Sequence, residues 1–255
     1  MNGRVQDKVA LVTGGASGVG LEAVKLLHAQ GARVAISDLN VQAGEALAAE
    51  LGERAMFVRH DVSSEADWTA AIATVQQHFG AALDVLVNNA GILIAGDMES
   101  GSIEDFRRLL QVNTESVFLG CQQGIAAMKA KGGAIINMAS VSSWLPVEPY
   151  AGYSASKAAV SALTRAAALN CRKQGYAIRV NSIHPDGIYT PMMQASLPKG
   201  VSKEMVLFDA QRNRAGRAYL PERIAQLVLF LASDESSVIS GSELHADNSI
   251  LGMGL

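Results

Sequence analysis

Short apolar runs alternate with longer amphipathic segments along the whole chain. The runs are rich in Val, Ile and Leu and end in glycine or polar residues, which is typical of strands buried on both faces of a parallel sheet. We expect about seven such strands, at residues 8–13, 31–38, 55–60, 83–88, 133–139, 179–184 and 241–246.

The longer segments repeat apolar residues at helical spacing. We expect helices at residues 21–29, 40–51, 63–79, 102–128, 151–173 and 221–231. The alternation predicts an α/β fold of the Rossmann type, a doubly wound parallel sheet with helices on both faces. Residues at about 186–220 break the pattern with prolines, glycines and methionines, and we interpret this segment as an insertion that covers a substrate.

Composition narrows the class of protein. With 255 residues, 49% of them hydrophobic, the chain suits one domain over residues 1–255. A net charge of -3 without a Lys/Arg run argues against nucleic acid or an anionic membrane as partner. The two cysteines and five histidines show no metal-ligand spacing, so we expect no metal. Without a signal-peptide pattern or a spanning apolar run, we expect a cytoplasmic protein.

A glycine-rich turn lies between the first predicted strand and the first predicted helix. It reads Gly14-Gly-Ala-Ser-Gly18-Val-Gly20. Glycines let the backbone approach a phosphate closely, and the free N–H groups of a helix start attract anions. The position therefore indicates a dinucleotide site, although a plain turn is the alternative.

Asp38 ends the second predicted strand, about 20 residues after the glycine turn. An acid at this place bonds the adenosine ribose hydroxyls and repels a 2′-phosphate, so Asp38 favours NAD over NADP. Its alternative role is to cap the helix expected at residues 40–51.

Polar residues also lie at the carboxyl ends of other predicted strands. Because ligands bind at this edge of doubly wound sheets, we expect the binding site to lie there. These residues are Thr13, Asp38, Asp61, Asn88, Ser140 and the pair His184–Pro185.

Tyr153 and Lys157 lie one helical turn apart and so project from the same face. A nearby cation lowers the pKa of a phenol, which would let Tyr153 exchange a proton with an alcohol or ketone oxygen. Ser140 can hydrogen-bond that same oxygen. The alternative is an ordinary solvated pair. Asn113, inside a predicted helix, faces solvent, bonds the preceding turn or holds a water that leads to Lys157.

In order and spacing, these motifs resemble those of the short-chain dehydrogenase/reductase family over the whole chain. The matching motifs are Thr13-Gly-Gly-Ala-Ser-Gly-Val-Gly20, Asp61-Val62, Asn88-Asn-Ala-Gly91, Asn113, Ser140 and Tyr153-x-x-x-Lys157. Within the family, the resemblance extends to bacterial enzymes that oxidise 3β- and 17β-hydroxysteroids.

The resemblance implies a proton relay at Asn113, Ser140, Tyr153 and Lys157, and it implies NAD as cofactor. The implied cofactor contacts are Gly14, Ser17, Gly18, Val19, Asp38, Leu39, Asp61, Val62, Asn88, Ala90, Gly91, Tyr153, Lys157, Pro185, Ile188 and Thr190. The family usually has Pro-Gly after its sixth strand, whereas this chain has Pro185-Asp186-Gly187. Asp186 adopts positive φ less readily than glycine, and it places a carboxyl group near the substrate pocket. The alternative is a slightly shifted turn that uses Gly187.

The implied substrate is an apolar secondary alcohol or ketone, most consistent with a steroid, because apolar walls and adaptable methionines suit a rigid hydrophobic molecule. The expected substrate contacts are Ser140, Ser142, Trp144, Tyr150, Tyr153, Gly187, Met192 and Met193. Two alternatives stay open: a dehydrogenase or reductase for another apolar alcohol or a 3-ketoacyl substrate, and a non-catalytic NAD(H)-sensing protein. The resemblance also implies a homotetramer.

Overall fold

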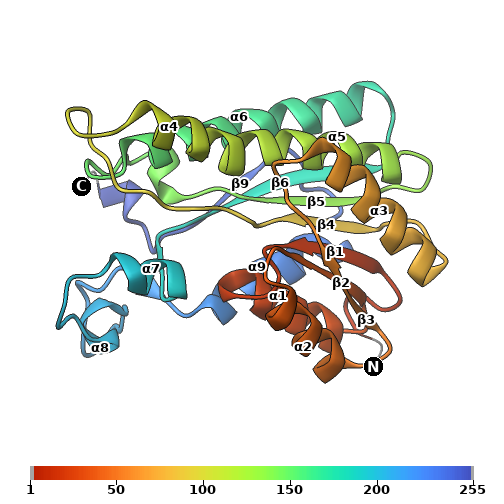
Figure 1. Cartoon of the computed structure of the whole chain (residues 1–255), viewed down its shortest axis with the longest axis horizontal. Helices are drawn as coiled ribbons and strands as arrows, with labels where there is room; N and C mark the ends of the chain where they lie inside the picture. Colours follow the sequence, from red (N-terminus) through yellow and green to blue (C-terminus); the bar gives the residue numbers. More distant parts are fainter. Residues whose placement is uncertain (1–2, 254–255) are drawn as a thin grey trace.

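The computed structural model describes residues 3–253 and contains a seven-stranded sheet in which every strand pairs in parallel with its neighbours (Figure 1). The strand order is β3-β2-β1-β4-β5-β6-β9. The strands are β1 (Val9–Thr13), β2 (Arg33–Asp38), β3 (Ala55–Arg59), β4 (Val85–Asn88), β5 (Gly133–Met138), β6 (Ile178–Pro185) and β9 (Glu243–Ala246). The prediction of a doubly wound parallel sheet is confirmed.

Helices cover both faces of the sheet, with α3, α4, α5 and α6 on one side and α1, α2 and α9 on the other (Figure 1). The helices are α1 (Gly18–Ala29), α2 (Val41–Leu51), α3 (Glu65–Phe79), α4 (Ile103–Leu110), α5 (Ser116–Met128), α6 (Ala151–Lys173), α7 (Pro191–Ser196), α8 (Lys203–Val206) and α9 (Pro221–Ala232). Among residues 3–253, none of these helices has both the length and the apolar character needed to span a bilayer.

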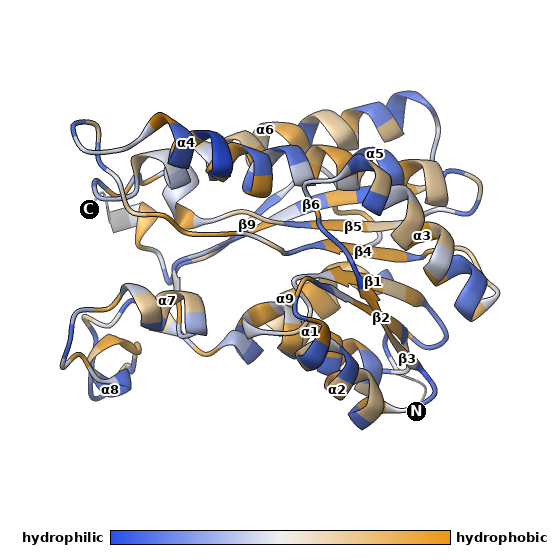
Figure 2. Ribbon diagram, in the orientation of Figure 1, coloured by the Kyte–Doolittle hydropathy of each residue, from blue (hydrophilic) through white to orange (hydrophobic). Residues whose placement is uncertain are grey.

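Alternation along the strands divides the core into two layers. Val12 and Ile36 pack with α1 and α9, whereas Leu11 and Ala35 pack with the layer of α3, α5 and α6. Because neighbouring strand residues point to opposite faces, strands covered on both sides must be apolar throughout. Figure 2 shows this pattern as continuous hydrophobic colour on the central strands and mixed colour on the outer helices.

The predicted helix at residues 102–128 is interrupted. It contains α4, a π-helical turn at Gln111–Glu115 and then α5. A π turn inserts one extra residue into the helical ladder and is often found at functional sites, and no apolar pattern marks it in advance. Here it carries Asn113, one of the expected catalytic residues.

The segment expected as an irregular insertion has short elements of its own. It contains β7 (Gly187–Ile188) and β8 (Ala218–Tyr219), which form a two-stranded parallel sheet. Between these strands, α7 and α8 form a lobe that projects beside the carboxyl edge of the main sheet (Figure 1). We call residues 189–217 the lobe.

Candidate active site

The site lies where the strand order reverses, between β1 and its neighbour β4. At the carboxyl end of β1, Thr13 Oγ1 accepts hydrogen bonds from the backbone N–H groups of Asn89 and Ala90 at 3.0 and 3.1 Å. In return, Asn89 Nδ2 donates to the carbonyl oxygens of Thr13 and Gly14. These bonds hold the loop after β4 against the glycine turn, so that both segments line the same cavity.

Two glycines in the turn after β1 have backbone conformations that other residues rarely adopt. Gly14 and Gly18 have φ angles of 61° and 54°. A Cβ on Gly14 would lie 3.0 Å from Ala90 Cα, and one on Gly18 would lie 3.2 Å from Thr190 Cγ2. Ser17 precedes α1 without a side-chain cap bond, so the first N–H groups of α1 stay available to a ligand. This arrangement suits an anionic phosphate.

Asp38 lies beside the glycine turn, at the carboxyl end of β2. Its carboxylate accepts hydrogen bonds from the backbone N–H groups of Ala16 at 3.1 Å and Asn40 at 2.9 Å. The cap of α2 is Asn40, whose side chain accepts from Ala43 N–H, so the alternative role of Asp38 as that cap is wrong. Leu39, expected beside it as a cofactor contact, is 57% exposed.

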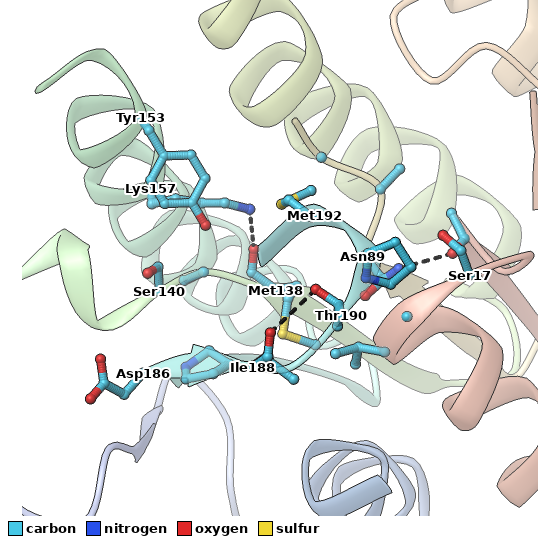
Figure 3. A pocket seen from close by; sticks show the side chains of 18 residues that line it. Ser17, Asn89, Met138, Ser140, Tyr153, Lys157, Asp186, Ile188, Thr190 and Met192 are labelled. Atoms are coloured by element: carbon cyan, nitrogen blue, oxygen red, sulfur yellow. Dashed lines mark hydrogen bonds between the residues drawn. The ribbon is translucent and has the colours of Figure 1, made fainter. Parts of the chain in front are cut away.

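The cavity at this edge has a volume of about 180 Å³ and is partly open to solvent. It brings together the glycine turn, the loop after β4, the start of α6 and the beginning of the lobe (Figure 3). Its lining residues are Gly14, Ser17, Gly18, Val19, Asn89, Ala90, Gly91, Met138, Ala139, Ser140, Tyr153, Lys157, Pro185, Asp186, Ile188, Thr190, Pro191 and Met192.

Tyr153, Lys157 and Ser140 meet at one end of this cavity (Figure 3). Lys157 Nζ lies 5.8 Å from the centre of the Tyr153 ring and donates to the carbonyl oxygen of Met138 at 2.8 Å. Ser140 Oγ accepts hydrogen bonds from the backbone N–H and the hydroxyl of Ser142 at 3.2 and 2.9 Å. Because both bonds use Ser140 Oγ as acceptor, its own hydrogen remains free to be donated.

Burial dominates the ionisation of the two titratable groups. It lowers the pKa of Lys157 to about 8, which leaves the ammonium mostly protonated at neutral pH. Burial also raises the pKa of Tyr153, and a hydrogen bond from Ser140 opposes that rise. The expectation that Lys157 holds the pKa of the phenol below its ordinary value is therefore wrong for the protein alone, because burial disfavours the phenolate by more than the hydrogen bond from Ser140 favours it.

Asn113 is fully buried in the π turn, and its side chain is already satisfied. Its Oδ1 accepts from Ile92 N–H at 2.8 Å, while its Nδ2 donates to the Ile92 carbonyl and to Ser156 Oγ, both at 3.0 Å. The alternative that Asn113 faces solvent is wrong. The side chain ties the loop after β4 to α6, one residue before Lys157.

Asn88 does not line the cavity, contrary to the expectation that it borders the cofactor path. It is buried and donates through Nδ2 to Asn137 Oδ1 at 2.8 Å. Alternation along β4 places Asn88 on the same face as Leu86, which packs in the layer of α3, α5 and α6. The wall residue is instead Asn89, which the sequence analysis missed and which this same alternation could have identified.

Asp61 and Val62 also lie outside the lining of this cavity. Asp61 accepts hydrogen bonds from the backbone N–H and the hydroxyl of Ser63 at 2.9 and 2.7 Å. Val62 is 9% exposed and packs in the core beside Trp68. In the structure, this pair shapes the start of α3.

The expected substrate contacts divide into two groups. Ser140, Tyr153 and Met192 line the cavity, and the Ser142 hydroxyl donates a hydrogen bond to Ser140 Oγ. The others do not line it: Trp144 is 56% exposed and donates to Glu243, Tyr150 precedes α6, Gly187 belongs to β7, and Met193 is half-buried in α7.

Asp186 forms a bidentate ion pair with Arg217, through two bonds of 2.9 Å. Its side chain is 7% exposed and lies at the cavity edge. Neither Asp186 nor Gly187 has a positive φ, so the alternative of a turn shifted onto Gly187 in that conformation is wrong. Arg217 was missed because nothing in the sequence pairs it with a residue 31 positions away.

The glycine turn, the uncapped start of α1 and the polar wall at Asn89 suit a dinucleotide laid across the strand switch. The buried amine beside a phenol and a hydroxyl suits proton exchange at the far end. Together, the fold and this site define a nucleotide-binding α/β oxidoreductase.

Comparisons with known proteins agree with this class. Residues 14–249 match the family described as enoyl-(acyl carrier protein) reductase. The chain is 82% identical over 255 residues to 3-beta-hydroxysteroid dehydrogenase from Comamonas testosteroni, covering 100% of each chain. It is 42% identical over 248 residues to 3-alpha-(or 20-beta)-hydroxysteroid dehydrogenase from Mycobacterium tuberculosis, covering 97% of this chain and 90% of the relative. Cyclopentanol dehydrogenase from Comamonas testosteroni is 43% identical over 249 residues, with 96% and 97% covered.

The chain belongs to the short-chain dehydrogenase/reductase family, as its motifs predicted. Members of this family are oxidoreductases that bind a nicotinamide cofactor.

Proposed function

We propose that the protein oxidises a secondary alcohol to a ketone, reversibly, with Tyr153 as acid–base and NAD as hydride acceptor. The main support for this proposal is that Tyr153, Lys157 and Ser140 line the same cavity as the glycine turn. When bound, the nicotinamide supplies the hydride chemistry, and the protein supplies orientation and proton transfer.

The hydrogen bonds around Ser140 support its role as a hydrogen-bond donor during proton transfer. Ser142 donates to Ser140 Oγ, which leaves the Ser140 hydrogen for the substrate oxygen or Tyr153. A neutral Tyr153 hydroxyl can protonate a ketone, while its phenolate can accept the proton of an alcohol. Since burial raises the pKa of Tyr153, we expect oxidation to accelerate, and reduction to slow, as the pH rises through that pKa.

Asp38 supports NAD rather than NADP. Its carboxylate lies at the carboxyl end of β2 and is bonded to Ala16 in the glycine turn. A 2′-phosphate placed on the adenosine ribose here would meet a negative charge.

The substrate class rests on similarity and on the cavity. The 82% identical relative is named a 3-beta-hydroxysteroid dehydrogenase, and Met192 adds an adaptable apolar side chain to the wall of the same cavity. We therefore propose 3β- and 17β-hydroxysteroids as substrates. The description of the matching family favours a second candidate, reduction of an acyl chain carried on a thioester, at a 3-keto group or at an enoyl double bond.

A substrate panel read by NADH fluorescence tests this proposal. It compares 3β-, 3α- and 17β-hydroxysteroids, cyclopentanol and a 3-ketoacyl thioester, each with NAD(H) and with NADP(H). We expect NADH formation with 3β- or 17β-hydroxysteroids. Turnover of the thioester alone would favour the second candidate, and cofactor binding without any turnover would indicate a sensor.

We further propose that the enzyme acts as a cytoplasmic homotetramer. Ile103, Phe106 and Phe118 are 53%, 36% and 52% exposed on α4 and α5, and other copies of the chain would cover these apolar side chains. Light scattering at several protein concentrations measures the mass of the assembly, and a monomer would contradict the proposal.

A further inference from the structure

Glu243, the first residue of β9, joins several elements that surround the reacting groups. Its side chain is 11% exposed. Oε2 accepts the indole N–H of Trp144 at 2.7 Å, and Oε1 accepts from Arg165 Nη1. Oε2 also lies 3.5 Å from His184 Nε2. The carboxylate therefore connects the segment after β5 and helix α6 by hydrogen bonds, and it lies beside His184 of strand β6.

His184, beside Glu243, is bonded to Ser140. Its ring is fully buried, and Nδ1 lies 3.1 Å from the carbonyl oxygen of Ser140. A carbonyl can only accept, so Nδ1 bears the hydrogen and, in the neutral ring, Nε2 is an acceptor. Ser182 Oγ, 2.9 Å from Nε2, is then the donor to it. The imidazole is thus held in one tautomer that fixes the backbone of Ser140.

The two residues that donate to Glu243 flank the catalytic groups along the chain. Trp144 follows Ser140 by four residues, beyond a short 3-10 turn at Val141–Ser143. Arg165 lies on α6, the helix that presents Tyr153 and Lys157. A single carboxylate therefore ties both the loop that carries the hydroxyl and the helix that carries the phenol to the edge strand of the sheet.

The same carboxylate with the rings of His184 and His245 also resembles a metal-ligand set, since their ligand atoms lie within 4.8 Å of one another. However, Glu243 already holds an arginine and an indole, and both nitrogens of His184 have partners. The Arg165 cation would repel a metal ion at this place. The contacts favour a hydrogen-bonded brace over a metal site.

We propose that Glu243 is a positioning residue for the reaction, holding Ser140 at its working distance from Tyr153. This inference rests on the proposed function. Catalytic groups lose rate steeply when displaced, about a hundredfold for a shift of about 1 Å. Loss of the carboxylate frees Trp144 and Arg165 together, so the loop and the helix lose their common anchor.

The test compares Glu243→Ala and Glu243→Gln with the wild-type enzyme. Because the carboxylate does not line the cofactor cavity, we expect Glu243→Ala to lower kcat about tenfold or more while the Kd for NAD(H) stays unchanged. Glu243→Gln keeps an acceptor for the Trp144 N–H, so we expect it to recover part of that loss. The anisotropy of tryptophan emission should fall in Glu243→Ala, because Trp144 loses its bond whereas Trp68 stays buried at 1% exposure.

Glu235→Ala is the matched control. Glu235 is bonded by Arg4 through two bonds of 2.7 and 2.6 Å, away from the cavity, and its loss should leave kcat unchanged. If Glu243→Ala does not fold, Arg165→Gln provides the test, since that side chain is 52% exposed and its removal breaks only the tie to α6. We then expect a lower kcat with an unchanged Kd for the cofactor.

A wild-type kcat in Glu243→Ala, or an equal loss in Glu235→Ala, would overturn the positioning role. So would a Glu243→Gln variant no better than Glu243→Ala. Failure of the proposed function is distinguishable, because the wild-type enzyme would then turn over none of the panel alcohols. In that case, the anisotropy difference still reports whether Glu243 anchors Trp144.

Discussion

Acidification should destabilise this protein before its carboxylates begin to titrate. His60 and His184 are 1% and 0% exposed, and burial lowers the pKa of each from 6.5 to about 4. The two nitrogens of His184 already have partners, and His60 Nε2 has no hydrogen-bond partner in the described part of the chain. The folded state therefore favours both neutral rings.

The direction and the size of this change in stability with pH follow from the folded and unfolded pKa values of the two histidines. Between about pH 6.5 and about pH 4 the unfolded chain binds protons that the folded protein excludes, so stability is full above this range and falls as the pH is lowered. A depression from 6.5 to about 4 corresponds to about 3 kcal/mol for each histidine. The pair together approaches the total stability of a typical domain, about 5–15 kcal/mol.

The carboxylates affect the stability of the protein over a lower range of pH. The pKa values of Asp67 and Asp97 are held below the ordinary value of 3.8 by hydrogen bonds to their carboxylates. Their stabilisation is therefore lost only below about pH 4. His28, half-buried, has a pKa that burial also lowers, so it adds in the same direction as the two buried rings.

Urea unfolding followed by circular dichroism between about pH 7 and about pH 5 measures the effect. We expect the free energy of unfolding to fall by about 1.4 kcal/mol per pH unit for each buried histidine in the middle of the range. His60→Gln should remove about half of that slope while keeping a partner for the Ser37 hydroxyl. His78→Gln, at an exposed position of α3, is the control. A slope unchanged in His60→Gln, or a flat profile in the wild-type protein, would refute the reasoning.

Three further substitutions test other parts of the structure. Tyr153→Phe should abolish turnover while cofactor binding, followed by NADH fluorescence, is retained; residual activity would remove Tyr153 from its role. Asp38→Ser combined with Leu39→Arg should shift the ratio of kcat/KM values toward NADP, because it replaces a carboxylate at the β2 edge with a cation, and Leu39→Arg alone is its control. Ser249→Gly should raise the free energy of unfolding by about 1 kcal/mol, because Ser249 is held at a φ of 68°. In contrast, Ser237→Gly, at a φ of -56°, should not stabilise the protein, and a gain there equal to that at Ser249 would contradict the explanation.

Local patterns were sufficient to predict the layers of the fold. The strands at β1, β2 and β5 and the long helix α6 were anticipated to within about two residues, because a strand buried on both faces must be apolar throughout. Glycine spacing likewise predicted the turn after β1. These features are set by residues that are close together along the chain, so their pattern can be read directly from the sequence.

Long-range contacts could not be predicted in this way. The ion pair of Asp186 with Arg217 and the bonds of Glu243 join residues that are far apart along the chain. The raised pKa of Tyr153 was also missed, because burial depends on everything packed around the ring. Asn88 is a different case, since strand alternation already contained the information that its side chain points toward α5.

The lobe enters and leaves the main body at adjacent points. β7 and β8 pair directly, with Gly187 opposite Ala218, and the Asp186–Arg217 bond lies beside the same junction. A segment whose two ends meet on a short ladder behaves as a cassette, which can change in length or composition without moving the strands beneath it. If residues 189–217 cover the substrate, as we propose, transplanting them between relatives should change which substrates are accepted and leave the reaction itself unchanged.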